Sequence, residues 1–117
     1  MQTLKEKISH LNQLILEGKA LDGFELYYDD EVVMQENAAE PTVGKDANRR
    51  RENEFFGSIT DFRGASVEGV AVGDSITTVI WHFDYTHKDW GVRNYKQVSV
   101  QHWENGKIVK EQFFYGN

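Results

Sequence analysis

Hydrophobic and polar side chains alternate along residues 75–87, which read SITTVIWHFDYTH. Successive side chains on a β-strand point to opposite faces, so the odd positions share one face. That face is almost wholly apolar and aromatic, and its members are Thr77, Val79, Trp81, Phe83 and Tyr85. At about 3.3 Å per residue the strand is about 40 Å long, so in a small domain it must bend. We therefore predict a curved sheet with the aromatic face of this strand lining its concave side.

The first half of the chain carries three helical patterns. Apolar residues at positions 4, 8, 11 and 15 recur at helical spacing, after a capping box of Thr3 and Glu6, and Gly18 marks the end of that helix. Two further helices are predicted over residues 21–28 and 47–56. A short strand over residues 32–36 and a loop with the single proline lie between them.

The second half has a period of two. Strands are predicted over residues 62–72, 75–87, 92–104 and 107–115, joined by turn signals that include Asp89-Trp90-Gly91 and Asn105-Gly106. This order indicates an α+β fold, with the helices against one face of a curved antiparallel sheet. A three-residue loop at positions 89–91 predicts that Tyr85 opposes Tyr95.

Composition narrows the possible classes of protein. The 117 residues fit one domain, residues 1–117. A net charge of −6 disfavours nucleic acid and acidic membranes as partners, and the lack of cysteine excludes disulfides and thiolate chemistry. No apolar run approaches the roughly 20 residues that span a bilayer, and the amino terminus lacks a signal-peptide core. A soluble, cytoplasmic protein is expected.

Four motifs carry a family resemblance: VMQEN (33–37), PTVGK (41–45), WHFDYTHKDWG (81–91) and QHWENGKIVKE (101–111). With the order of elements, they resemble the SnoaL-like polyketide cyclase branch of the nuclear transport factor two-like superfamily over essentially the whole chain. The resemblance implies a cone: a curved sheet wrapped around three N-terminal helices and an internal cavity. It also implies a homodimer that pairs through the convex sheet face, for which Ile80, Val98, Val100 and His102 are the outward candidates.

The superfamily includes ketosteroid isomerase, which uses a tyrosine and two aspartates. By spacing, these positions fall on Leu11, Gln35 and Gln101, none of which can do that chemistry. Gln35 and Gln101 are instead candidates to orient a ligand carbonyl or hydroxyl, or are simply satisfied by the backbone or by each other.

Glu111 is the titratable candidate, but its side depends on the last hairpin. A plain two-residue turn at Asn105-Gly106 points Glu111 outward, whereas a bulge in that hairpin points it into the cone, as the superfamily pattern implies. Inside, it would have a raised pKa and act as an acid or base; outside, it is a surface or ion-paired glutamate.

The concave face supplies candidate ligand contacts, which are either pocket walls or plain core: Trp81, Phe83, Tyr85, Gln97, Ser99, Trp103 and Tyr115. No cofactor is predicted. No metal is predicted either, because His82 and His102 lie about 13 Å apart along the strands. His87 is expected to be exposed beside the loop, or else to guard the mouth of the cone. The run 49–51 of arginines is expected to pair with Glu52 and Glu54 on a solvated helix face, with Glu36 or Asp46 as an alternative partner for one of them.

Three functions stay open. The first is a SnoaL-like enzyme, of cyclase, isomerase or dehydratase type, that acts on a small apolar or carbonyl-bearing molecule with Gln35, Gln101 and Glu111 as its polar groups. The second is a non-catalytic module that binds an apolar ligand. The third is a dimerisation scaffold with a filled interior.

Overall fold

The computed structural model describes residues 2–116 and has three helices and six strands. The helices are α1 (Leu4–Leu16), α2 (Ala20–Tyr27) and α3 (Lys45–Gly57). The strands are β1 (Tyr28–Glu36), β2 (Thr42–Val43), β3 (Ile59–Val72), β4 (Ile76–His87), β5 (Gly91–Glu104) and β6 (Lys107–Tyr115). The α+β class is therefore confirmed.

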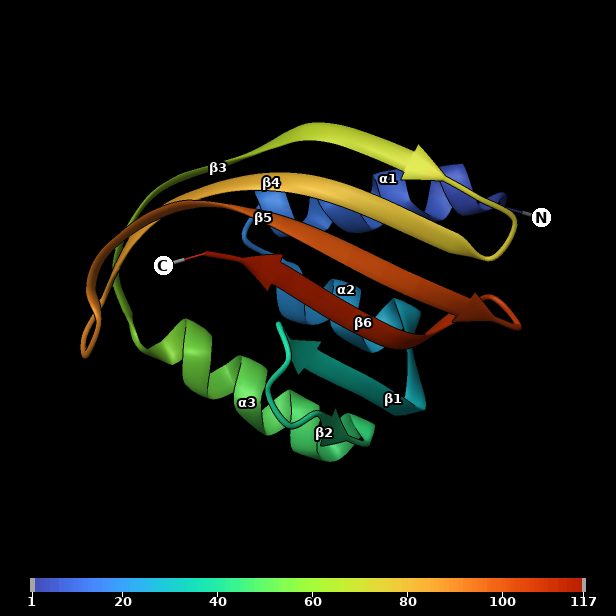
Figure 1. Ribbon diagram of the computed structural model, residues 1–117, viewed down its shortest axis with the longest axis horizontal. Helices are drawn as coiled ribbons and strands as arrows, with labels where there is room; N and C mark the ends of the chain where they lie inside the picture. The colour runs from blue at the N-terminus through green and yellow to red at the C-terminus, as the bar shows by residue number, and fades with distance from the viewer. Residues whose placement is uncertain (1, 117) are drawn as a thin grey trace.

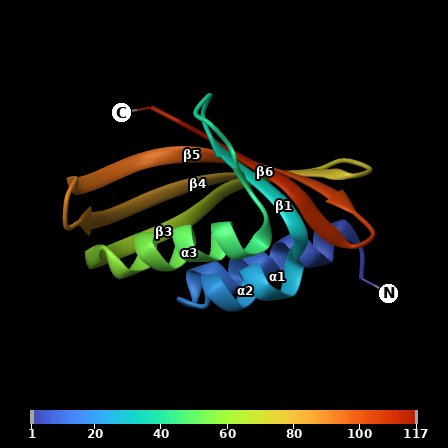
Figure 2. The same cartoon turned by 90° about the horizontal axis from the view of Figure 1, so that it is seen from below.

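All six strands form one sheet in the order β2-β1-β6-β5-β4-β3. β1 runs parallel to β6, and the other neighbours are antiparallel. The long strands β3, β4 and β5 curl strongly without closing the sheet into a barrel (Figure 1). Figure 2 shows the three helices on the same side of this sheet, so the concave face and the helices enclose the interior.

Local sequence signals explain the helix starts and stops. Thr3 and Glu6 form the predicted capping box, and Gly18 has a φ of 78° just after α1, a conformation that glycine adopts without strain. α3 starts earlier than predicted, with Gly44 at its N-cap, so Asp46 lies in the first turn and accepts a hydrogen bond from Arg49 at 2.6 Å.

The loop of the β4–β5 hairpin has the predicted three residues but lies one residue earlier in the chain. His87 pairs with Gly91, so the loop is residues 88–90, and Tyr85 opposes Arg93 instead of the predicted Tyr95. Gly91, with a φ of 77°, closes this loop in the left-handed conformation. The register differs by two residues, which leaves every side chain on its predicted face.

A β-bulge in the β5–β6 hairpin decides where Glu111 points. Asn105-Gly106 makes the two-residue turn, but the register shifts between His102 and Trp103, which leaves Val109 as an extra residue on β6. Ile108 and Glu111 are consequently both buried on the inner face, at 0% and 4% exposure. Of the two alternatives for Glu111, the inward one is confirmed.

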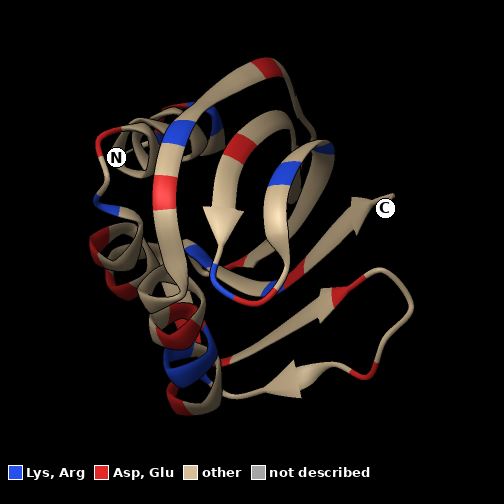
Figure 3. Cartoon of the chain, turned by 90° about the vertical axis from the view of Figure 1, so that its left-hand side faces the viewer, with Lys and Arg blue, Asp and Glu red and all other residues tan. Residues whose placement is uncertain are grey.

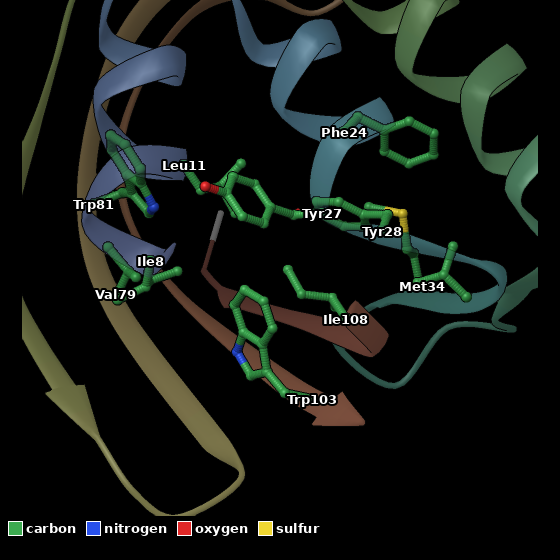
Figure 4. Packing of buried hydrophobic residues seen from close by; sticks show 11 residues of the cluster. Ile8, Leu11, Phe24, Tyr27, Tyr28, Met34, Val79, Trp81, Trp103 and Ile108 are labelled. Carbon is green, nitrogen blue, oxygen red and sulfur yellow. The ribbon is translucent and has the colours of Figure 1, made fainter. Parts of the chain in front are cut away.

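The apolar core fills the end of the cone under α1 and α2. Its contacts join Ile8 and Leu11 of α1 to Val79 and Trp81 of β4, and Trp103 of β5 packs against Tyr27 (Figure 4). Among residues 2–116, no helix is long and apolar enough to cross a membrane.

Candidate functional site

A pocket of about 960 Å³ lies between α3 and the inner face of the sheet. One wall is aromatic: Trp81 and Phe83, two residues apart on β4, stack with ring centroids 5.2 Å apart and planes 13° from parallel. Six predicted ligand contacts line this pocket, namely Trp81, Phe83, Tyr85, Gln97, Ser99 and Tyr115. The alternation along β4 thus produces the wall that the sequence predicted.

Trp103 shares their face but does not reach the pocket lining. Its indole N–H donates to Thr77 Oγ1 at 2.9 Å, and its ring packs against Tyr27 in the core. Trp103 lies beyond the bulge, where α2 already covers the sheet, so its predicted role as a ligand contact gives way to a structural one.

A buried chain of hydrogen bonds leads from the core to Glu111. Thr77 Oγ1 donates to Gln101 Oε1 at 2.7 Å, and Gln101 Nε2 donates to Glu111 Oε2 at 2.7 Å. Tyr28 donates its hydroxyl to the other carboxylate oxygen, Oε1. The side-chain amide of Gln101 uses its oxygen as an acceptor and its nitrogen as a donor, so Gln101 orients Glu111 and each side chain in this series has a partner.

Burial dominates the acidity of Glu111. Removal from water raises the pKa of its carboxyl to about 7, although the hydrogen bonds from Tyr28 and Gln101 act in the opposite direction. Burial and the nearby carboxylate also raise the pKa of the Tyr28 hydroxyl, which therefore stays a donor. The site holds a carboxyl group whose charge changes close to neutral pH.

Glu52 is a second such group, which the sequence did not reveal. Its neighbours Arg49 and Arg51 pair elsewhere, with Glu25 and Glu36, instead of with Glu52. Burial and then the charge of Glu111 raise the pKa of Glu52 to about 7, with no hydrogen bond contributing. Both carboxyl groups line the pocket.

The helical period of α3 would have found Glu52. Asn48, Glu52 and Phe55 lie at spacings of four and three and share the inward face of the helix. Asn48 is buried and donates to the carbonyls of Val32, Thr42 and Gly44, which fixes α3 against β1 and β2. This anchor aims Glu52 inward.

Gln35 touches the pocket but is separate from the Glu111 chain. Its side-chain amide donates to the carbonyl of Ala39 at 2.8 Å and so holds the loop between β1 and β2. Of the two alternatives for satisfying Gln35, the backbone partner is found, and within residues 2–116 Gln35 and Gln101 do not bond each other. On β1, Gln35 pairs with Gln112 of β6, whereas the preceding residue, Met34, pairs with Glu111.

The end of the pocket nearest the β4–β5 hairpin is polar. The hydroxyls of Tyr85 and Tyr95 are 2.8 Å apart, and Tyr115 donates its hydroxyl to Glu36, which Arg51 also binds. Arg93 lies over the Tyr95 ring, with Cζ 5.1 Å from the centroid. We call Tyr85, Arg93, Tyr95 and Tyr115 the hairpin-end group. Figure 3 looks onto the molecule from that side and shows bands of both charge signs.

His87 is buried at 5% exposure, contrary to its predicted position in solvent. Its ring stacks on Trp90 with centroids 3.7 Å apart, and its Nδ1 accepts hydrogen bonds from the backbone N–H groups of Asp89 and Trp90. The tight loop folds Trp90 back over His87, which is why the histidine is covered. Both residues line the pocket.

His82 and His102 lie on the outer face of the sheet. His82 bonds Asn94 at 2.6 Å, and Asp84 pairs with Arg63 at 2.9 Å. His102 opposes Ile76 on β4. Across residues 2–116, no three histidine, aspartate or glutamate side chains are grouped to hold a metal ion.

Comparison with known proteins assigns the fold to a family. The family model described as the SnoaL-like domain matches residues 3–115. The chain belongs to the SnoaL-like domain family. None of the curated proteins matches it significantly.

Solved structures agree with the SnoaL-like assignment. A protein from Mesorhizobium loti, described as a SnoaL-like polyketide cyclase and as a carbohydrate phosphatase, is 26% identical to this chain. It superposes with a TM-score of 0.88 over 97% of this chain and 100% of that one. One from Jannaschia sp. CCS1, also assigned as a SnoaL-like polyketide cyclase, gives 0.80 at 11% identity over 98% and 90%. A Xanthomonas campestris protein of unknown function with a cystatin-like fold gives 0.86 at 11% identity over 99% and 92%.

Proposed function

We propose that this SnoaL-like domain binds a small, largely apolar molecule bearing a carbonyl group in its pocket and transfers a proton on it. The observation that carries the proposal is the pair Glu52 and Glu111, two carboxyl groups with pKa values near 7 beside an aromatic wall. A volume of about 960 Å³ suits a small-molecule ligand. An unfilled pocket of this size counts against the scaffold with a filled interior.

The two carboxyl groups suit proton transfer because the charge of one affects the acidity of the other. The charge of Glu111 raises the pKa of Glu52, so the pair favours holding one proton near neutral pH. In the proposed step, the Glu52 carboxylate removes a proton from the carbon beside the carbonyl. The protonated Glu111 carboxyl donates a hydrogen bond to the carbonyl oxygen, where negative charge develops. Tyr28 and Gln101 hold Glu111 in place.

Deuterium exchange tests this step directly. The ketone 2-acetylnaphthalene has exchangeable methyl protons next to its carbonyl and an apolar body for the Trp81–Phe83 wall. In deuterated buffer, NMR should show exchange catalysed by the protein, with a maximum near pH 7. Glu52→Gln and Glu111→Gln should each slow it by roughly 100-fold or more, the usual contribution of a general acid or base. Glu40→Gln, an exposed loop position, is the matched control.

A non-catalytic binding module is the second candidate. It is favoured by one observation: both oxygens of Glu111 already accept hydrogen bonds from the protein. Binding of 2-acetylnaphthalene by calorimetry without any exchange above the buffer rate would support this candidate and refute proton transfer on this ketone.

We also propose a homodimer through the convex face of the sheet. Ile80, Val98 and Phe114 form a row across β4, β5 and β6, because Val98 pairs with both of the others. Ile80 and Phe114 are 39% and 43% exposed. A partner copy that covers this row would remove apolar surface from water.

A further inference from the structure

Arg93 is the basic side chain in the hairpin-end group, and its polar atoms are incompletely used. Its Nε is buried and has no hydrogen-bond partner among residues 2–116. Within the same range, no carboxylate lies within 4.0 Å of its guanidinium, whereas Arg49, Arg51 and Arg63 all form ion pairs. A buried donor without a partner lowers the stability of the folded state, so the presence of this unpaired N–H calls for an explanation.

The surroundings hold this guanidinium in place over the pocket. Arg93 pairs with Tyr85 across the β4–β5 ladder, on the inner face of the sheet, and its Cζ lies 5.1 Å from the Tyr95 ring centroid. Its positive charge acts on both Tyr95 and Tyr115, lowering the pKa values that burial raises. Stacking on the ring positions the planar donor fork without neutralising its charge.

A hydroxyl donor is available beside it. Tyr85 and Tyr95 share one hydrogen bond, which uses one of their two O–H protons. No further acceptor for the second proton is found in residues 2–116, and Tyr115 is already committed to Glu36. The hairpin-end group therefore combines a guanidinium that has no carboxylate partner with a spare O–H, both on residues that line the pocket, and together they match an acceptor bearing negative charge.

We propose that the ligand of this pocket carries a carboxylate, which Arg93 and the Tyr85–Tyr95 pair bind at the hairpin end. This inference rests on the proposed ligand-binding function and narrows its substrate class to apolar carboxylic acids with a carbonyl group. The adjoining part of the ligand lies against Phe83, which pairs with Tyr95, and then against Trp81. Arg93 is at most about 26 Å along β5 from Gln101, so a ligand that also reaches Glu111 is elongated.

Calorimetry with two matched probes tests this assignment. The first is 3-(2-naphthoyl)propionate, and the second is its primary amide, which has nearly the same shape but no charge. The natural chain should bind the carboxylate about tenfold more tightly or better, the value of a charge-assisted hydrogen bond. Arg93→Gln should remove that preference and leave binding of the amide within about twofold.

Two further variants separate charge, geometry and folding. Arg93→Lys keeps the charge but loses the planar fork, so it should retain only part of the preference. Arg50→Gln removes an equal charge from an exposed position of α3 outside the pocket lining, and should keep the whole preference. Circular dichroism with thermal unfolding establishes that each variant is folded before titration.

Each outcome has a distinct meaning. Equal affinity of the natural chain for the two probes would overturn the carboxylate proposal and leave the ligand pocket standing. A preference that survives in Arg93→Gln would overturn the role of Arg93. Failure of both probes to bind would count against the pocket function as well as the inference.

Discussion

Replacing Glu111 with glutamine should change the free energy of unfolding more favourably at pH 8 than at pH 4, with the natural chain at the same pH as the reference. Burial raises the pKa of Glu111 from an ordinary 4.5 to about 7. Below about pH 4.5 the carboxyl is protonated in both the folded and unfolded states, so it has little effect on stability. Between pH 4.5 and 7 the unfolded chain releases the proton that the folded chain keeps, and the folded state is progressively disfavoured.

The magnitude follows from that difference. Each pKa unit corresponds to 1.36 kcal/mol, so a rise from 4.5 to about 7 costs the ionised folded state about 3 kcal/mol. Glutamine cannot ionise and is spared this cost. It keeps an acceptor oxygen for Gln101 or Tyr28, and any loss from the altered hydrogen bonding is the same at both pH values.

Urea unfolding at pH 4 and pH 8 measures the effect. At each pH, the change in unfolding free energy caused by Glu111→Gln is determined. The change at pH 4 is then subtracted from the change at pH 8, which cancels the loss from altered hydrogen bonding. We expect this difference to favour the variant by about 3 kcal/mol. The exposed Glu40→Gln variant should give a difference near zero.

Glu52 affects the interpretation because the charge of Glu111 contributes to its raised pKa. Removing Glu111 should therefore lower the pKa of Glu52 and stabilise the folded state further at pH 8. The double variant with Glu52→Gln separates the two contributions. A pH-independent change in stability for Glu111→Gln would refute the assignment of its raised pKa to burial in the folded state.

Three further changes test other parts of the structure. Tyr28→Phe removes a donor to ionised Glu111, so an NMR titration should show the pKa of Glu111 raised above about 7. Urea unfolding at pH 8 should show a loss of about 1–3 kcal/mol in unfolding free energy. An unchanged pKa of Glu111 would exclude the hydrogen bond from Tyr28. Phe83→Leu should weaken binding of 2-acetylnaphthalene, because Phe83 forms part of the aromatic wall. Trp103→Phe should lower stability without changing the affinity for this ketone, because Trp103 bonds Thr77 outside the pocket lining. An equal loss of affinity in both variants would contradict these placements. Ile80→Lys should convert the dimer to a monomer, as measured by analytical ultracentrifugation. His82→Lys, on the same face of the sheet, is the control for the added charge. A natural chain that sediments as a monomer would refute the dimer.

The parts of the fold that depend on local pattern could be predicted from the sequence. The capping box of α1 and the alternation along β4 each involve residues close in the chain, and both gave the right elements and the right inner face. The predicted β4–β5 register was wrong by two residues, but the predicted aromatic wall is unaffected, because a register shift of two residues keeps each side chain on the same face of the sheet.

The position of Glu111 depended on a long-range feature. The extra residue at Val109 is accommodated only once β6 lies between β5 and the parallel strand β1, which is distant in sequence. Glu52 was missed for another reason: three preceding arginines suggested a solvated helix face. Arg49 and Arg51 find partners on other elements, and the anchor at Asn48 turns Glu52 inward.

The most direct measurement of the central claim is a carbon-13 NMR titration of the glutamate side-chain carboxyl groups. Two resonances should titrate near pH 7, and the assignments come from Glu111→Gln and Glu52→Gln, each of which lacks one of them. If no glutamate in the natural chain titrates near pH 7, the pocket has no carboxyl group poised at neutral pH, and the proposed proton transfer is wrong.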